Sequence, residues 1–152
     1  MIEAHFTSTV YIVENDRTLL IYHKKFKKWL PPGGHIHPNE IPSETAIREA
    51  KEETGLEIEL IRQENVWIDQ WNAKSIPRPY MCLLEEIPAL GDQAAHRHID
   101  MIFLARPVGG AEEMNHHETE GLQWFTLEEM ENLEADVEIF EETKETLRKI
   151  LT

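Results

Sequence analysis

The segment from residue 34 to residue 56, GHIHPNEIPSETAIREAKEETGL, constrains the fold of this chain more than any other stretch. Pro42 suits the first turn of a helix, because its missing N–H would have no partner there. Gly55 suits the position just beyond a helix end, where the backbone turns left-handed. Together the two residues predict a helix over residues 42–54.

The predicted helix concentrates negative charge on one face. Glu49, Glu52 and Glu53 stand at i, i+3 and i+4, so their carboxylates lie within one turn of each other. Like charges at this spacing repel, which costs stability unless a cation compensates them. Mg²⁺ or Mn²⁺, which prefer oxygen ligands, are the natural compensating ions. The adjoining stripe expected to pack on the body of the protein consists of Ala46, Ile47, Ala50 and Thr54.

Most of the remaining chain has the β-branched and aromatic composition that is typical of strands. The expected strands are residues 6–13, 18–23, 57–61, 65–71, 80–87, 98–105 and 122–125. The run Pro31-Pro32-Gly33-Gly34 is expected to form an irregular turn where the backbone can approach a ligand. Helices are expected over residues 127–133, capped by Thr126, and over residues 137–151. This order predicts a mixed α/β fold built in layers.

Length, charge and cysteine content limit the classes of partner. At 152 residues the chain fits one domain, which we expect to span residues 1–152. A net charge of −14 argues against general binding to nucleic acid or to a membrane surface. We see no signal peptide, no run near the roughly 18 apolar residues of a membrane span, and a single cysteine, Cys82. We therefore expect a cytoplasmic protein, and the sequence leaves a homodimer open.

The central segment resembles the signature of the Nudix superfamily. That signature is G, five residues, E, seven residues, then R-E-U-x-E-E-x-G-U, where U is a bulky aliphatic residue. The chain supplies the fixed positions with Gly34, Glu40, Arg48, Glu49, Glu52, Glu53, Gly55 and Leu56. It departs at Ala50, a smaller apolar residue, and His37 stands where many relatives carry glutamate. The lead-in WLPPGGH resembles that of MutT-like members. The resemblance implies a Nudix-type α/β/α sandwich with a mixed sheet and a catalytic loop-helix-loop.

The resemblance also implies a reaction, in which water attacks a phosphorus atom of a nucleoside diphosphate linked to another group. By this resemblance the ligands of Mg²⁺, or of Mn²⁺, are the carboxylates of Glu49, Glu52 and Glu53 and the backbone carbonyl of Gly34. Arg48 would orient the acidic cluster, and Glu40 would brace the loop before the helix. The general base is left open, because it is a helix glutamate in some members and a loop glutamate in others. The candidates in the loop are Glu118 and Glu120.

Candidate substrate contacts come from residues outside the signature. Lys28 ends the only dense basic cluster, residues 24–28, which is either a solvated loop or a phosphate-attracting one. His98 alternates with His96 on one expected strand face, which favours a pocket contact. Trp71 and Tyr80 could stack on a nucleobase, although aromatic residues in strands more often belong to the core.

The leading interpretation is a MutT-like hydrolase of (deoxy)nucleoside triphosphates. Hydrolysis of ADP-ribose, nucleotide sugars or dinucleoside polyphosphates is the alternative, and a non-catalytic nucleotide-sensing module is the rival from another class. Removal of a 5′-diphosphate from RNA would require the basic cluster at residues 24–28 to supply the phosphate contacts.

Overall fold

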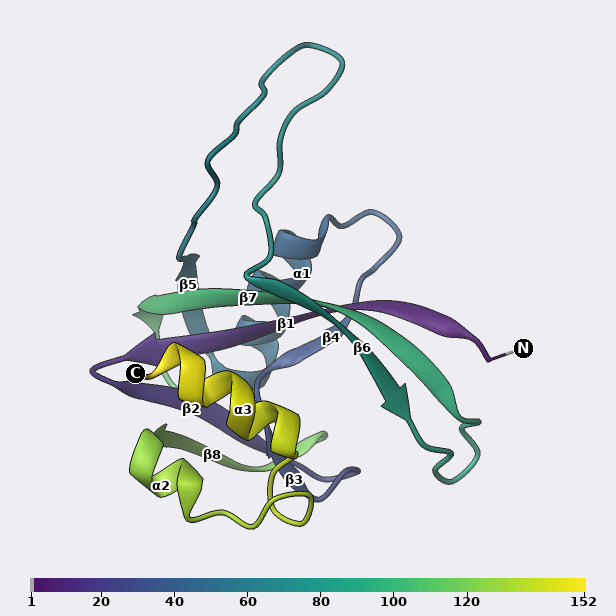
Figure 1. Ribbon diagram of the computed structural model, residues 1–152, viewed down its shortest axis with the longest axis vertical. Helices are drawn as coiled ribbons and strands as arrows, with labels where there is room; N and C mark the ends of the chain where they lie inside the picture. The colour runs from purple at the N-terminus through teal and green to yellow at the C-terminus, as the bar shows by residue number, and fades with distance from the viewer. Residues whose placement is uncertain (1) are drawn as a thin grey trace.

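The computed structural model describes residues 2–152, and within this range the chain forms an eight-stranded mixed sheet (Figure 1). The strand order is β3-β2-β1-β7-β5, with β4 also paired to β1, β6 to β7 and β8 to β2. The strands are β1 (Ala4–Glu14), β2 (Arg17–His23), β3 (Lys28–Leu30), β4 (Gly33–His35), β5 (Leu56–Leu60), β6 (Met81–Ile87), β7 (His96–Gly110) and β8 (Thr119–Thr126). The long strands β1 and β7 run parallel, whereas the other pairs are antiparallel.

Helices cover both faces of this sheet, because alternate strand residues carry apolar side chains to opposite sides. Val10 and Ile12 of β1 pack with Ala46 of helix α1 (Pro42–Thr54) on one face. Tyr11 packs on the other face with Leu147 of helix α3 (Glu141–Ile150), beside the short helix α2 (Leu127–Glu131). In Figure 1 the sheet lies between α1 and α3. The α/β/α sandwich expected from the sequence is therefore confirmed.

The ends of the elements follow from local chemistry. Asn15 and Asp16 have φ angles of 51° and 61°, which allow a two-residue turn between β1 and β2. Helix α1 begins at Pro42, as predicted, and Gly55 ends it with a φ of 79° and an N–H bonded to the Lys51 carbonyl at 3.0 Å. A side chain at Gly55 would overlap the Ala111 carbonyl, so glycine is required there.

Two expectations about strand boundaries are wrong. Gly33 and Gly34 do not form an irregular turn but belong to β4, where they pair with Thr9 and Ser8 of β1. Strand β7 extends beyond residues 98–105 at both ends and includes Pro107. The proline is tolerated because the register between β5 and β7 shifts there, and such a bulge releases a backbone donor from the ladder.

Three further expectations fail because their apolar residues have no layer to pack against. Residues 65–71 form no strand and belong to the loop that projects from the body between β5 and β6 (Figure 1). Ile47 is 42% exposed, since the inner face of α1 is filled by the smaller Ala46, Ala50 and Thr54. The last helix begins at Glu141 rather than at residue 137, and Val137 is exposed. Within residues 2–152 no helix is long and apolar enough to span a membrane.

Candidate active site

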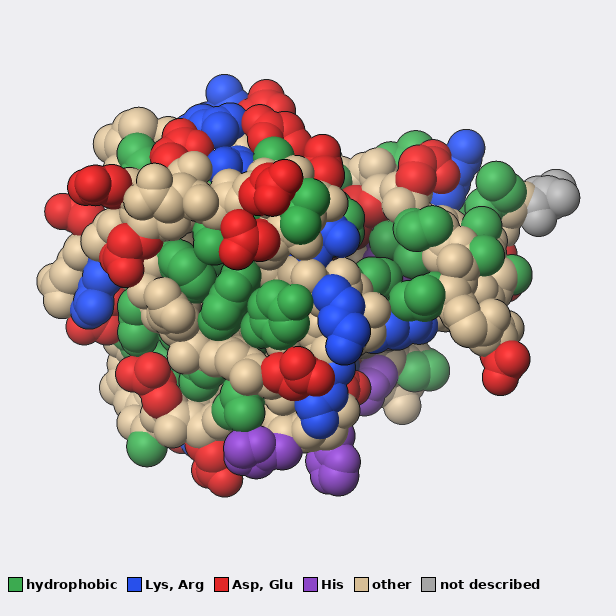
Figure 2. All heavy atoms as spheres, turned by 90° about the horizontal axis from the view of Figure 1, so that it is seen from below, with side chains coloured by type: hydrophobic (Ala, Val, Ile, Leu, Met, Phe, Trp, Pro, Cys, Tyr) green, Lys and Arg blue, Asp and Glu red, His purple; other side chains and the backbone are tan. Residues whose placement is uncertain are grey.

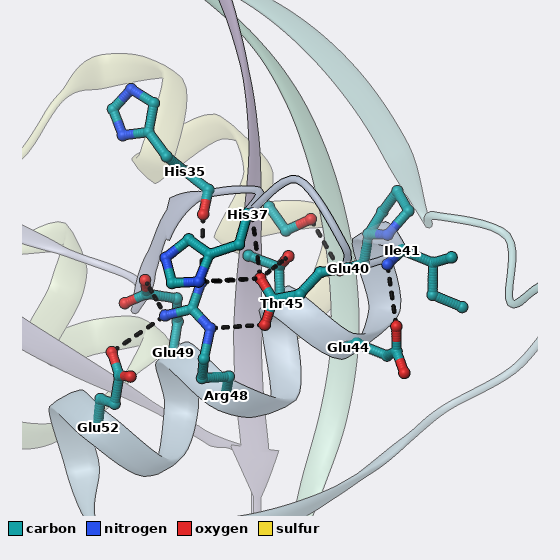
Figure 3. A network of polar contacts seen from close by, with 11 residues as sticks. His35, His37, Glu40, Ile41, Glu44, Thr45, Arg48, Glu49 and Glu52 are labelled. Atoms are coloured by element: carbon teal, nitrogen blue, oxygen red, sulfur yellow. Dashed lines mark hydrogen bonds and ion pairs between the residues drawn. The ribbon is translucent and has the colours of Figure 1, made fainter.

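Arg48 is the centre of a polar network that joins helix α1 to the loop before it (Figure 3). Its Nε–H and Nη2–H donate to the two carboxylate oxygens of Glu40, at 2.7 and 3.0 Å. Its Nη1–H donates to Glu49 at 2.9 Å and to Glu52 at 3.1 Å, and its Nη2–H reaches the His35 carbonyl at 3.2 Å. The planar guanidinium therefore sets the positions of two carboxylates relative to β4.

Glu40 accepts hydrogen bonds from three different residues of the loop and helix α1. Besides Arg48, its carboxylate accepts the Thr45 hydroxyl at 2.8 Å and the His37 N–H at 3.2 Å. The hydrogen bonds from Arg48 lower the pKa of Glu40 to about 2. Glu40 is therefore a permanent anion that anchors the loop.

Glu49 and Glu53 are the buried carboxylates of the site. They are 9% and 3% exposed, whereas Glu52 lies at the exposed end of the face. Burial raises the pKa of Glu49 to about 7, against the opposing effect of Arg48. Burial and then the charge of Glu49 raise the pKa of Glu53 well above its usual range. When both groups are ionised, their protein neighbours do not fully compensate their negative charge.

Two glycines bring the β4 backbone against these carboxylates. The Gly33 N–H donates to Glu53 at 2.9 Å. A Cβ atom on Gly34 would overlap the Glu49 carboxylate, and one on Gly33 would overlap Thr9. The absence of side chains on β4 therefore permits the close approach of strand and helix.

The donor set fits a hard divalent cation. It consists of two buried carboxylates, the exposed carboxylate of Glu52 and the backbone of Gly34 beside Glu49. Oxygen donors of this kind are those that Mg²⁺ and Mn²⁺ prefer. A cation here would also relieve the repulsion that raises the pKa of Glu53.

Two adjoining cavities extend from the carboxylates. The first has a volume of about 590 Å³ and is lined by apolar residues such as Leu83, Ile102 and Phe140, with Lys28 among them. The second, about 500 Å³, is lined by Glu49, Glu53 and Glu118. Gly33, Gly34, Glu53 and His98 line both, so the two cavities form one continuous site. On the face shown in Figure 2, basic side chains gather in a strip beside an apolar patch.

The floor of the first cavity carries a buried acid that the sequence analysis did not identify. Asp100 is 3% exposed and accepts the hydroxyls of Thr7 and Thr9 at 2.9 and 2.8 Å. Burial, followed by the charge of Glu85, raises the pKa of Asp100 to about 7, and burial raises the pKa of Glu85 to about 6. The available signal was a charged residue within the apolar strand HIDMIFLA.

The residues predicted to contact substrate divide into two groups. Lys28 lines the first cavity, with its Nζ 4.9 Å from the centre of the Phe140 ring, and His98 lines both cavities. Trp71 and Tyr80 line neither cavity. Trp71 is 94% exposed in the projecting loop, so the structure does not support the expectation that it stacks on a base.

Of the two loop glutamates considered as general base, Glu118 lies beside Glu49 and Glu53, whereas Glu120 does not line the site.

Comparisons with known proteins agree with this fold. The NUDIX domain family matches residues 4–147. A hydrolase of the NUDIX family from Clostridium perfringens is 31% identical, with a TM-score of 0.78 over 97% of this chain and 95% of that one. A MutT protein from Methanosarcina mazei Go1 shares the fold at 18% identity, with a TM-score of 0.69 over 97% of this chain and 92% of that one. The asymmetrical bis(5′-nucleosyl)-tetraphosphatase of Mus musculus is 41% identical in an alignment 54 residues long that covers 32% of this chain. The match spans only 37% of that mouse enzyme.

Proposed function

This chain belongs to the NUDIX family of hydrolases, which act on phosphoric anhydrides, and on that premise we propose that it hydrolyses a (deoxy)nucleoside triphosphate or a related nucleoside diphosphate derivative. The observation that carries the proposal is the continuity of the two cavities. One end holds the buried carboxylates Glu49 and Glu53, and the other is apolar with polar groups on its floor. This arrangement suits a ligand with a charged phosphate end and a flat, hydrogen-bonding base.

Mg²⁺, with Mn²⁺ as the alternative, would be held by the three helix glutamates, Glu49, Glu52 and Glu53, and by Gly34. When bound, such an ion neutralises phosphate oxygens and makes a water molecule more acidic. Arg48 holds two of the carboxylates in position through its hydrogen bonds. The protein itself thus supplies a fixed set of carboxylates from Glu49, Glu52 and Glu53, which we call the glutamate cradle.

Glu118 is our candidate for the group that accepts the proton of the attacking water. The helix glutamates already accept hydrogen bonds from Arg48 or from the Gly33 N–H. Glu118 lines the same cavity from the loop before β8, and its charge contributes to the raised pKa of Glu53. A carboxylate in that place can receive a proton without breaking the hydrogen bonds that hold the helix glutamates in position.

The first cavity supports recognition of a nucleobase. Its apolar walls, which include Phe140, suit the faces of a base, and Lys28 suits the phosphates. Asp100 and Glu85 have pKa values raised to about 7 and about 6, so near neutral pH the pair can both donate and accept hydrogen bonds. His98 borders this floor and could contact the ligand directly.

Dinucleoside polyphosphates are the second substrate class. The observation in their favour is the likeness to tetraphosphatases from Mus musculus and Rattus norvegicus, although each match covers 37% or less of that enzyme. Lys25 and Lys28 on the cavity wall also suit a longer phosphate chain. A non-catalytic sensing module is disfavoured because every carboxylate of the signature is present. A cytoplasmic location and a homodimer remain predictions from the sequence.

The test is a substrate panel assayed with Mg²⁺ and with Mn²⁺. It contains the nucleoside triphosphates, 8-oxo-dGTP, ADP-ribose, nucleotide sugars and dinucleoside polyphosphates, and chromatography identifies the products. We expect turnover of a triphosphate to a monophosphate and pyrophosphate. Preferential turnover of a dinucleoside polyphosphate would favour the second class. Nucleotide binding without turnover of any compound would contradict both.

A further inference from the structure

Four histidines from three neighbouring strands lie together, and three of them, His35, His96 and His98, line the second cavity. They are His5 of β1, His35 of β4, and His96 and His98 of β7. The parallel register places His5 opposite His98, and Thr7, two residues along β1, lies opposite His35. Residues two apart on a strand share a face, so the sheet brings all four side chains together. The ring centres of His5 and His96 are 4.7 Å apart, and those of His96 and His98 are 4.9 Å apart.

The nitrogen atoms of these rings converge. His5, His96 and His98 can each offer one ring nitrogen so that all three lie within 4.8 Å of one another. The closest approach within this set is 3.1 Å, between the two Nε2 atoms of His96 and His98, and His35 Nε2 lies 3.1 Å from His5 Nδ1. Nitrogens about 2.0–2.1 Å from a tetrahedral metal ion are about 3.3 Å from each other. Separations between 3.1 Å and 4.8 Å bracket this value, so modest side-chain shifts are enough to enclose an ion.

The outer nitrogens of the three rings face hydrogen-bond acceptors. His96 Nδ1 lies 3.0 Å from the Ala94 carbonyl, which can only accept, so Nδ1 carries a hydrogen and Nε2 is the nitrogen available to an ion. His5 Nε2 lies 3.0 Å from the Glu3 carboxylate, and His98 Nδ1 lies 3.7 Å from that of Glu85. Histidine ligands of metals usually have such an acceptor on the second nitrogen, which directs the lone pair of the first toward the ion.

From this geometry we propose that His5, His96 and His98, with the exposed His35 beside them, bind a divalent transition-metal ion of the Zn²⁺ class. Imidazole nitrogens suit Zn²⁺, Cu²⁺ and Ni²⁺, whereas carboxylate oxygens suit Mg²⁺. The site is thus chemically distinct from the glutamate cradle and does not depend on the proposed substrate. The two sites adjoin, because the His35 carbonyl accepts the Nη2–H of Arg48 at 3.2 Å. As a ligand, His98 would shape the cavity rim through the ion.

The experiment is a Zn²⁺ titration of the tag-free, full-length protein after removal of metals, in excess Mg²⁺ and with a chromophoric chelator as competitor. We expect one tightly held Zn²⁺ per chain, and Co²⁺ in its place should give the visible absorption of a four- or five-coordinate site. His5→Asn and His98→Asn should each weaken Zn²⁺ binding roughly tenfold or more. His116→Asn is the matched control, because His116 is exposed and lies outside the cluster. It should bind Zn²⁺ as the wild type does.

Two further measurements separate this site from its alternatives. His96 is 4% exposed and its replacement could disturb folding, so the test uses the more accessible His5 and His98, with circular dichroism of each variant. Glu53→Gln should retain the Zn²⁺ site. Equal Zn²⁺ affinity in the wild type and in both histidine variants would overturn the proposal. Loss of Zn²⁺ binding in Glu53→Gln but not in His98→Asn would also overturn it, because the ion would then lie on the carboxylates.

Discussion

Arg48 and Glu40 form a bidentate ion pair, in which Nε–H and Nη2–H of the arginine donate to the two carboxylate oxygens at 2.7 and 3.0 Å. The pair crosses from helix α1 to the loop that follows β4. Because the third nitrogen of the same guanidinium binds Glu49 and Glu52, the loop and the carboxylates form one rigid unit. Preorganisation of this kind is what a metal-dependent hydrolase requires of its ligands.

We predict that Arg48→Lys lowers kcat roughly tenfold or more, because an ammonium group cannot reproduce the planar fork. Glu40→Gln should have a similar effect by removing the anion of the pair. Kinetic constants for both single variants and for the double variant test this. The double variant should lose much less than the sum of the two losses in activation free energy. Fully additive losses would show that the two residues act independently.

We predict that Gly34→Ala lowers the affinity for the activating metal ion and lowers turnover. The new Cβ would overlap the Glu49 carboxylate and displace it from the site. Gly109→Ala is the matched control, since there the closest atom belongs to the movable end of the exposed Glu57 side chain. Mg²⁺ titrations of activity compare the two variants. An unchanged Mg²⁺ dependence in Gly34→Ala would contradict the assigned packing.

Stability should depend on pH through Asp100. Its pKa rises from an ordinary value of about 4 to about 7, chiefly through burial, so the folded protein retains a proton that the unfolded chain releases. The free energy of unfolding therefore falls as pH rises through this window. Asp100→Asn cannot lose a proton, so its stability relative to the wild type should increase, by roughly 3 kcal/mol, between about pH 4 and about pH 7. Urea unfolding at both ends of the window measures this. A difference that is independent of pH would exclude Asp100 as the titrating group.

We predict that Lys28→Met raises KM for the nucleotide severalfold and leaves kcat nearly unchanged. Lys28 lines the first cavity but not the second, which Glu49 and Glu118 line, so its charge would assist binding rather than the chemical step. Lys149→Met, an exposed lysine of α3, is the control for the loss of one positive charge. Equal KM values for the two variants would show that Lys28 does not bind the phosphates of the substrate.

The sequence was most informative where local chemistry decides the structure. The bounds of α1 follow from Pro42 and Gly55, and the common face of Glu49, Glu52 and Glu53 follows from helical spacing. The hairpin at Asn15 and the cap at Thr126 are local in the same sense. These features need only a few neighbouring residues, so a single sequence is enough to predict them.

The remainder depends on strand pairing between distant residues, which one sequence does not specify. Asp100 accepts a hydrogen bond from Thr7, which is 93 residues away in the sequence, because β1 and β7 pair in parallel. The four histidines converge through the same pairing and that of β4. The aromatic residues at 67 and 71 are typical of a strand, but the sheet offers that segment no place, and Trp71 remains exposed.

We propose that buried glutamates of α1 hold the metal ion on which hydrolysis of a phosphoric anhydride by this chain depends. The most direct test is the Mg²⁺-dependent kcat/KM of Glu53→Gln, measured on the nucleotide that the wild type hydrolyses fastest. Glu57→Gln, at an exposed glutamate of β5, is the control. We predict a loss of roughly a hundredfold or more in Glu53→Gln, with an unchanged circular dichroism spectrum, and no loss in Glu57→Gln. Turnover by Glu53→Gln at the wild-type rate, or wild-type turnover that persists after complete removal of divalent metal, would contradict it.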